Sequence, residues 1–175
     1  VNFHNRHLPW VRDVSRLIAE GTIGDVRVVQ LQIASGPRHY DNWRADPVMA
    51  GLGSVHNVGV HGLDFLRVLL HSDPVEVMAM FDQAPGSGEV EMLALIQLRF
   101  ENGVMVQYNA NEKLRDPLND IVIYGSQGRV VGRSFTRSLS DGELAILTDA
   151  GETTTRYPAP EAHRLSLAAF TSAVL

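Results

Sequence analysis

The chain has 175 residues, of which 45% are hydrophobic and 20% are charged, and these values exclude a collagen, a long coiled coil or a largely disordered protein. Its net charge of −5 and the lack of a basic cluster argue against nucleic-acid binding, which depends on neutralising phosphates. The sequence contains no cysteine, which excludes disulfides and thiolate metal sites and is typical of a cytoplasmic protein. No apolar segment is long enough to cross a membrane, so we expect no membrane association.

The first half of the chain predicts two helices and one strand. Residues 9–20 have apolar side chains at helical spacing, begin with a proline and end before a glycine, which predicts a helix. Residues 25–34 have the alternation of a strand. The polar loop 36–50 is longer than most connections, which makes it a candidate for function. Residues 54–71 predict a second helix.

The second half predicts a run of strands, because its apolar residues recur at every second position. We expect turns at residues 85–88 and at the Asn-Gly pair 102–103, and a last helix from residue 161. Helices followed by a run of strands are typical of an α+β domain with an open, mainly antiparallel sheet and helices packed on one face. The predicted strands lie at 75–82, 90–100, 104–112, 120–125, 129–135, 143–148 and 153–157.

We interpret residues 1–175 as one domain of a longer polypeptide. No repeat or linker divides the sequence. The chain starts with Val1 rather than Met, in a segment that predicts a strand over residues 1–5, and it ends at Leu175 within an amphipathic run that has no stop signal. Removal of a tag or propeptide is the alternative.

The outward face of the predicted sheet resembles an interface. In the second long strand this face is apolar at its centre, at Leu95, and charged at its ends, at Glu91 and Arg99. The neighbouring strand adds Met78 and Met80 to the apolar centre. Because an apolar core with a polar rim is typical of interfaces, we predict that this face forms a homo-oligomer. A loop or terminal segment that covers it is the alternative.

Residues 54–71 hold the side chains best suited to chemistry. Asn57, His61 and Asp64 are spaced i, i+4, i+7 and would share one stripe of a regular α-helix. His61 is the candidate general acid or base, because imidazole exchanges a proton near neutral pH. Asn57 could hold a hydroxyl or orient the imidazole, and Asp64 could fix its tautomer or raise its pKa. The alternative is that His61 is an ordinary surface or capping histidine.

The glycines and histidines nearby predict neither a phosphate nor a metal site. Gly51 and Gly53 resemble the start of a phosphate-binding loop, but the sixth position is His56 and no strand leads directly into it. His56 and His61 are five residues apart and do not share a helix face, as two zinc ligands would. Glycines inside the predicted helix, such as Gly62, indicate that another backbone approaches closely.

Three blocks of residues occur in order along the chain. The first has Glu20, Gly21, Ile23, Gly24 and Val26, the second has Trp43, Arg44, Asp46 and Pro47, and the third has Gly51, Gly53, Asn57, Gly59, His61 and Asp64. Together they resemble the C-terminal domain of the sugar-dehydrogenase family named for glucose–fructose oxidoreductase, inositol dehydrogenase and the MocA protein. The resemblance spans nearly the whole chain.

This resemblance implies the C-terminal domain of an NAD(P)-dependent oxidoreductase. Such an enzyme transfers a hydride between nicotinamide and a secondary alcohol of a sugar, polyol or related compound. An N-terminal Rossmann domain, absent from this chain, would bind most of the NAD or NADP and supply a lysine. The C-terminal domain would shape the small-molecule substrate site and form oligomers, often through the sheet face. The chain alone is expected to be inactive.

The resemblance also implies roles for individual residues. His61 matches the catalytic histidine of the family, and Asn57 stands where the family has an aspartate. Asn57 could position the reacting oxygen but lacks the charge of a carboxylate. Trp43 and Arg44 would line the mouth of the site against cofactor or substrate, with Asp64 in the substrate site. A tryptophan buried in a surface loop is the alternative for Trp43.

Two other classes of function remain open. The full protein could be a sensor that binds a dinucleotide or sugar without turnover, because the family includes such regulators and Asn57 departs from its pattern. The chain could also be a stand-alone domain that dimerises through its sheet.

Overall fold

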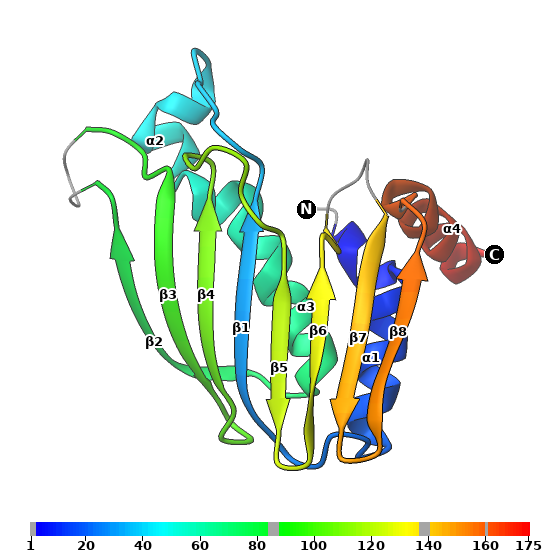
Figure 1. The fold of residues 1–175 in the computed structure, drawn as a ribbon. Coiled ribbons are helices and arrows are strands. Elements are labelled where there is room, and N and C mark those ends of the chain that lie inside the picture. Colours follow the sequence, from blue (N-terminus) through cyan, green and yellow to red (C-terminus); the bar gives the residue numbers. More distant parts are fainter. Residues whose placement is uncertain (1–2, 84–87, 137–140, 160) are drawn as a thin grey trace.

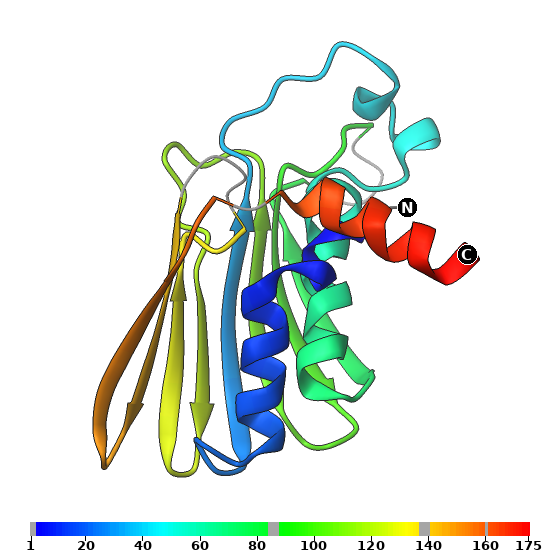
Figure 2. The same cartoon turned by 90° about the vertical axis from the view of Figure 1, so that its right-hand side faces the viewer.

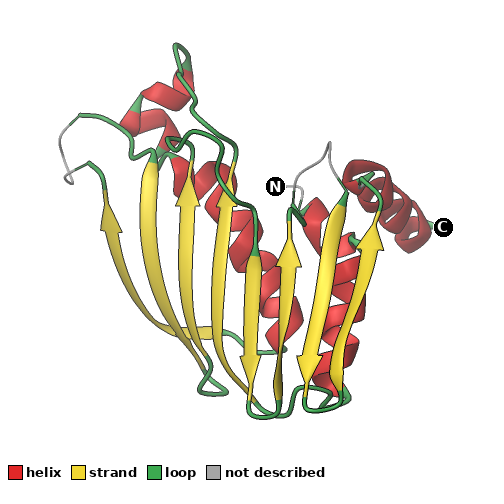
Figure 3. Ribbon diagram, viewed as in Figure 1, coloured by secondary structure: helices red, strands yellow, loops and turns green. Residues whose placement is uncertain are grey.

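The computed structural model describes residues 3–83, 88–136, 141–159 and 161–175, and these form an open eight-stranded sheet with helices on one face (Figures 1 and 3). Two helices, α1 (Pro9–Ala19) and α3 (Val60–Leu70), lie along the same face (Figure 2). No helix of the described residues covers the opposite face. The α+β class expected from the sequence is therefore confirmed.

The sheet is antiparallel apart from one central pair of strands. Across the sheet the order is β2-β3-β4-β1-β5-β6-β7-β8, and β1 runs parallel to β4. All other neighbouring strands are antiparallel. The strands are β1 (Val26–Ala34), β2 (Pro74–Phe81), β3 (Leu93–Phe100), β4 (Met105–Asn111), β5 (Ile121–Gly125), β6 (Gly128–Arg133), β7 (Gly142–Thr148) and β8 (Gly151–Tyr157).

Several short helical elements and the longer helix α4 lie near one end of the sheet. Two of them, η2 and α2, belong to the long loop that rises beyond the strands (Figure 2). The C-terminal helix α4 lies against η1 at the same end. These elements are η1 (His4–His7), η2 (Trp43–Ala45), α2 (Pro47–Ala50), η3 (Val55–Gly59) and α4 (Ala162–Val174).

The hydrophobic core lies between the sheet and helices α1 and α3. Trp10 of α1 packs edge-on against Phe65 of α3 and Phe135, with ring centroids 5.6 Å and 4.4 Å away. All three side chains are buried. Burying an aromatic or aliphatic side chain of this size is worth about 1.5–3 kcal/mol, so the predicted apolar stripe of the first helix anchors it to the sheet.

Strand β3 shows why the twofold pattern was informative. Ala94, Ile96 and Leu98 are buried beneath the helices, whereas Leu95 and Gln97 lie on the open face. The Asn-Gly turn that follows is also confirmed, with Gly103 at a φ of 83°. Successive side chains of a strand point to opposite faces, so the sequence alone identified which residues face the core.

Two local predictions were wrong. Residues 4–7 form a 3₁₀ turn rather than part of a strand, because this segment packs against α3 and α4 instead of joining the sheet. The predicted helix over residues 54–71 is not regular, because its first part, Val55–Gly59, is π-helical. The turn expected at 85–88 falls almost entirely outside the described residues.

Candidate functional site

The N-terminal end of η3 is closed by a carboxylate of the protein itself. Glu91 is 5% exposed, and its two carboxylate oxygens accept hydrogen bonds from the amides of Gly53 and Val55 at 2.7 Å and 3.0 Å. A Cβ on Gly53 would overlap the backbone carbonyl of Glu91. The glycine is therefore needed for close packing, and these amides are not free to hold a phosphate.

The three polar side chains that were expected on one stripe have different partners, and Asn57 lies in a π-helical turn that precedes His61. A π turn contains more residues than an α turn, so it shifts the phase of the side chains that follow. Asn57 contacts Glu112 and Tyr40, His61 contacts the rings of η1, and Asp64 pairs with Arg6. Among the described residues, neither Asn57 nor Asp64 makes a hydrogen bond to His61.

Asn57 belongs to a cluster that the sequence did not reveal. Its Nδ2 lies 3.1 Å from Glu112 Oε2 and 3.4 Å from the hydroxyl of Tyr40, which donates to Glu112 Oε1 at 2.8 Å. Burial and the hydrogen bond to Glu112 raise the pKa of Tyr40 to about 12, so the phenol stays protonated at neutral pH. The available signals were a tyrosine in the long loop and a glutamate at the end of a predicted strand.

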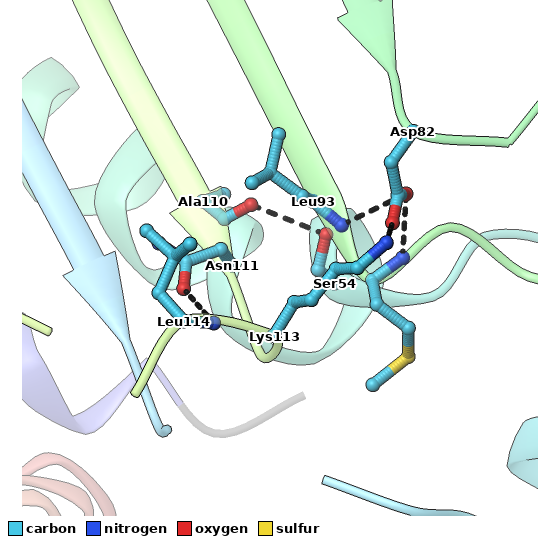
Figure 4. A network of polar contacts seen from close by, with 8 residues as sticks. Ser54, Asp82, Leu93, Ala110, Asn111, Lys113 and Leu114 are labelled. Atoms are coloured by element: carbon cyan, nitrogen blue, oxygen red, sulfur yellow. Dashed lines mark hydrogen bonds and ion pairs between the residues drawn. The ribbon is translucent and has the colours of Figure 1, made fainter. Parts of the chain in front are cut away.

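The segment that carries Glu112 is held firmly at the end of β3 and β4. Figure 4 shows Asp82 accepting hydrogen bonds from two backbone amides and from Lys113 Nζ, the last at 2.8 Å. Burial opposes the charged form of Asp82, but the hydrogen bonds from Lys113 and the amides prevail and lower its pKa. Ser54 joins η3 to the same place by donating to the carbonyl of Ala110 at 3.2 Å.

His61 is half-buried in a group of three histidines. Its ring centroid lies 4.8 Å from that of His4, which stacks at 4.3 Å on His163 of α4. Burial first, and then the charge of His4, lower the pKa of His61, while Asp64 acts in the opposite direction. Because its pKa lies below 6.5, His61 is neutral at pH 7 and able to accept a proton.

Asp64 has a different partner from the one expected. It is 5% exposed, and both carboxylate oxygens are bonded to the guanidinium of Arg6, with Nε to Oδ2 at 2.8 Å. This pair ties η1 to α3. The 58 residues between Arg6 and Asp64 explain why spacing within the helix could not indicate it.

Trp43 and Arg44 lie together in the exposed loop. The indole is 50% exposed, so the alternative of a buried tryptophan is wrong. The guanidinium of Arg44 lies 4.5 Å from the indole centroid, within range of a cation–π interaction. Asn42 caps this turn by accepting from the amide of Arg44 at 3.0 Å, which holds the pair at the surface.

The open face of the sheet has the apolar centre that was expected, but Glu91, predicted at its charged edge, is buried against η3 because it bonds to the amides there. Met78 and Met80 are 68% and 71% exposed, and Leu95 is 47% exposed. They line a shallow depression of about 560 Å³. A row of side-chain amides crosses this depression, and in it Gln30 Nε2 donates to Gln107 Oε1 at 3.2 Å. The apolar pattern of the strands did not predict this row.

Within the described part of the chain, no three histidine, aspartate or glutamate side chains are placed to hold a metal ion. None of the described helices has the length and apolar character needed to span a bilayer.

Comparison with known proteins identifies the family of this chain. Residues 11–131 match the family model described as the GFO/IDH/MocA C-terminal domain. The chain belongs to this family. The matched segment contains all three blocks of residues on which the resemblance was based.

Individual GFO/IDH/MocA relatives are about twice as long as this chain. The 1,5-anhydro-D-fructose reductase of Ensifer adhaerens is 28% identical over 177 residues, covering 99% of this chain and 53% of that protein. A 3-ketoreductase from Actinomadura kijaniata, solved with TDP-benzene and NADP, has a TM-score of 0.77 at 21% identity, over 99% of this chain and 52% of its own. A super-repressor mutant of Gal80p from Saccharomyces cerevisiae has a TM-score of 0.78 at 17% identity, over 98% and 50%.

Proposed function

We propose that this chain is the substrate-binding C-terminal domain of an NAD(P)-dependent oxidoreductase. The reaction is hydride transfer between nicotinamide and a secondary alcohol of a sugar, polyol or related compound. The observation that carries this proposal, beside family membership, is that η3 and α3, which follow each other directly, carry partly exposed Asn57, hydrogen-bonded to Tyr40, and partly exposed His61. These side chains can bind a hydroxyl and exchange its proton.

The amides at the start of η3 do not fit the phosphates of a dinucleotide. The amides that begin η3 are occupied by Glu91, as shown above. We therefore infer that the cofactor is held mainly by an N-terminal nucleotide-binding domain, with Trp43 and Arg44 contributing contacts at the mouth of the site. When bound, the nicotinamide supplies the hydride chemistry.

The side chains of this domain would bind the substrate and manage one proton. Neutral His61 accepts the hydroxyl proton as the alcohol is oxidised and returns it in the reverse direction. Asn57 binds a hydroxyl of the substrate. Asp64 supports the site through Arg6, which fastens η1 and with it His4, whose ring lies against His61.

We also propose that the open sheet face joins two copies of the protein. Met78, Met80 and Leu95 provide an exposed apolar centre, and the ion pair between Glu76 and Arg99 lies toward its edge. An apolar centre within a polar rim is typical of protein interfaces.

A regulator without turnover is the second candidate. Its support is the fold shared with Gal80p and the presence of an amide, rather than a carboxylate, at residue 57. The two candidates differ in what happens after the small molecules bind.

The test uses the full-length polypeptide that contains this chain. It is assayed with NADH, NADPH and their oxidised forms against polyols and keto sugars, following the nicotinamide absorbance. Turnover is expected from the full-length protein and not from residues 1–175 alone. Binding of cofactor and sugar without turnover would refute the enzyme and support the regulator.

A further inference from the structure

The buried carboxylate of Glu112 accepts hydrogen bonds from Tyr40 and Asn57, two partly exposed residues near the proposed substrate site. Glu112 is 2% exposed and follows the last residue of β4. Its amide donates to the carbonyl of Met92 at 2.8 Å, and its own carbonyl accepts from the amide of Arg38 at 2.8 Å. The backbone on both sides therefore fixes the place of this side chain.

The hydrogen bonds of this carboxylate all come from neutral side chains. Oε1 accepts from the hydroxyls of Tyr40 at 2.8 Å and Ser35 at 2.9 Å, and Oε2 accepts from Asn57 at 3.1 Å. In the described ranges no lysine or arginine forms an ion pair with Glu112. A buried carboxylate without a cation depends on its hydrogen-bond donors, so it constrains how those donors point.

The orientation of the Asn57 amide follows from this. A carboxylate only accepts hydrogen bonds, so the nitrogen of Asn57 must face Glu112. The oxygen Oδ1 is then left over, and no described residue donates a hydrogen bond to it. Tyr40 likewise directs its hydroxyl hydrogen toward Glu112, and its oxygen accepts from Asn57 Nδ2 at 3.4 Å, which leaves one lone pair. Both partly exposed groups therefore offer an acceptor, and an acceptor matches a hydroxyl group that donates.

We propose that Glu112 is a positioning residue, which turns Asn57 and Tyr40 so that each presents an oxygen lone pair to a substrate hydroxyl other than the reacting one. Glu112 does not touch the substrate itself. The arrangement favours a sugar or polyol over a compound with a single hydroxyl, because each hydroxyl has one hydrogen to donate and the reacting hydroxyl gives its hydrogen to His61. The inference rests on the proposed function.

The test exchanges the carboxylate and the amide between the two positions in the full-length protein. In Glu112→Gln the new NH₂ group faces the NH₂ group of Asn57, so the Asn57 amide rotates by half a turn and presents its nitrogen to the substrate. We therefore expect kcat/KM to fall by about tenfold or more, with most of the change in KM. Asn57→Asp alone places two carboxylates together and is also expected to lose activity. In the double variant the new aspartate accepts from the new glutamine and from the substrate, so activity should return to within about threefold of wild type.

The controls separate positioning from folding and from the proposed function. Glu143→Gln on β7, which removes a charge paired with Arg133 at the far part of the sheet, should leave activity unchanged. Thermal unfolding of every variant shows whether it folds. Full activity in Glu112→Gln, or additive losses in the double variant, would overturn the inference and leave the proposed function standing. A wild-type protein without turnover on any polyol or sugar would refute the proposed function, and the inference with it.

Discussion

Replacing Gly62 with alanine tests the contact that seats α3 on the sheet. A Cβ there would lie 2.5 Å from the ring Cζ of Tyr108, which is buried and bonded through its hydroxyl to the carbonyls of Val58 and Gly59 at 3.2 Å and 3.1 Å. Overpacking lowers the free energy of unfolding by about 1–3 kcal/mol, and loss of the hydrogen bond lowers it by about 1 kcal/mol. The better helix propensity of alanine raises it by about 1 kcal/mol. We expect the free energy of unfolding to fall by about 1–3 kcal/mol.

Gly59→Ala is the matched control three residues earlier in the same helical segment. A Cβ at Gly59 would meet its nearest neighbour, the Cβ of Ala110, at an ordinary 3.5 Å. This variant should therefore be unchanged, or more stable by up to about 1 kcal/mol. Urea unfolding of the chain measures both free energies. Equal stability of the two variants would refute the reasoning, because only Gly62 faces the tyrosine. The same contact corrects one expectation: a side chain, not a backbone, approaches this glycine.

Two further predictions concern the open face and the histidine. Leu95→Lys places a charge at the centre of the apolar face and should dissociate the oligomer, as measured by light scattering. Leu167→Lys, on the exposed side of α4, is the control and should leave the mass unchanged. An unchanged mass for Leu95→Lys would show that the interface lies elsewhere. Burial of His61 and the charge of His4 lower the pKa of His61, so below pH 6.5 the unfolded chain binds a proton that the folded chain takes up only at lower pH. Stability should therefore be complete above this pH and decrease as the pH falls through it, and less so in His61→Asn. Identical urea midpoints across pH 7.5 to 5.5 for the wild type would contradict this.

The sequence was most informative where structure depends on local periodicity. Alternation over residues 93–100 predicted both the strand and the face that contacts the core, because successive side chains of a strand point to opposite faces. The helical stripe through Trp10 and Val14 predicted α1 in the same way, and both residues are buried. The pattern of elements then indicated the α+β class.

Features that depend on distant residues were not predictable from these patterns. The pairing of β1 with β4 joins residues 77 positions apart, such as Val28 and Met105, and no local signal specifies it. The π turn at Val55–Gly59 packs against β4, and the apolar spacing of residues 54–71 does not indicate it. A wheel drawn at 100° per residue assumes a regular α-helix and so does not describe this turn. Glu91 and Glu112 approach η3 from strand ends, so only the fold brings them to it.

The central claim is that His61 exchanges the substrate proton in a full-length oxidoreductase of which this chain is the C-terminal domain. The most direct test is kcat/KM of the full-length His61→Ala variant with its preferred sugar or polyol. His71→Asn, at the exposed end of α3 where an asparagine tolerates the φ of 47°, is the matched control. We predict a loss of roughly 10²-fold or more for His61→Ala and none for the control. A loss of less than about threefold for His61→Ala would contradict the account, because an acid–base group contributes far more than that.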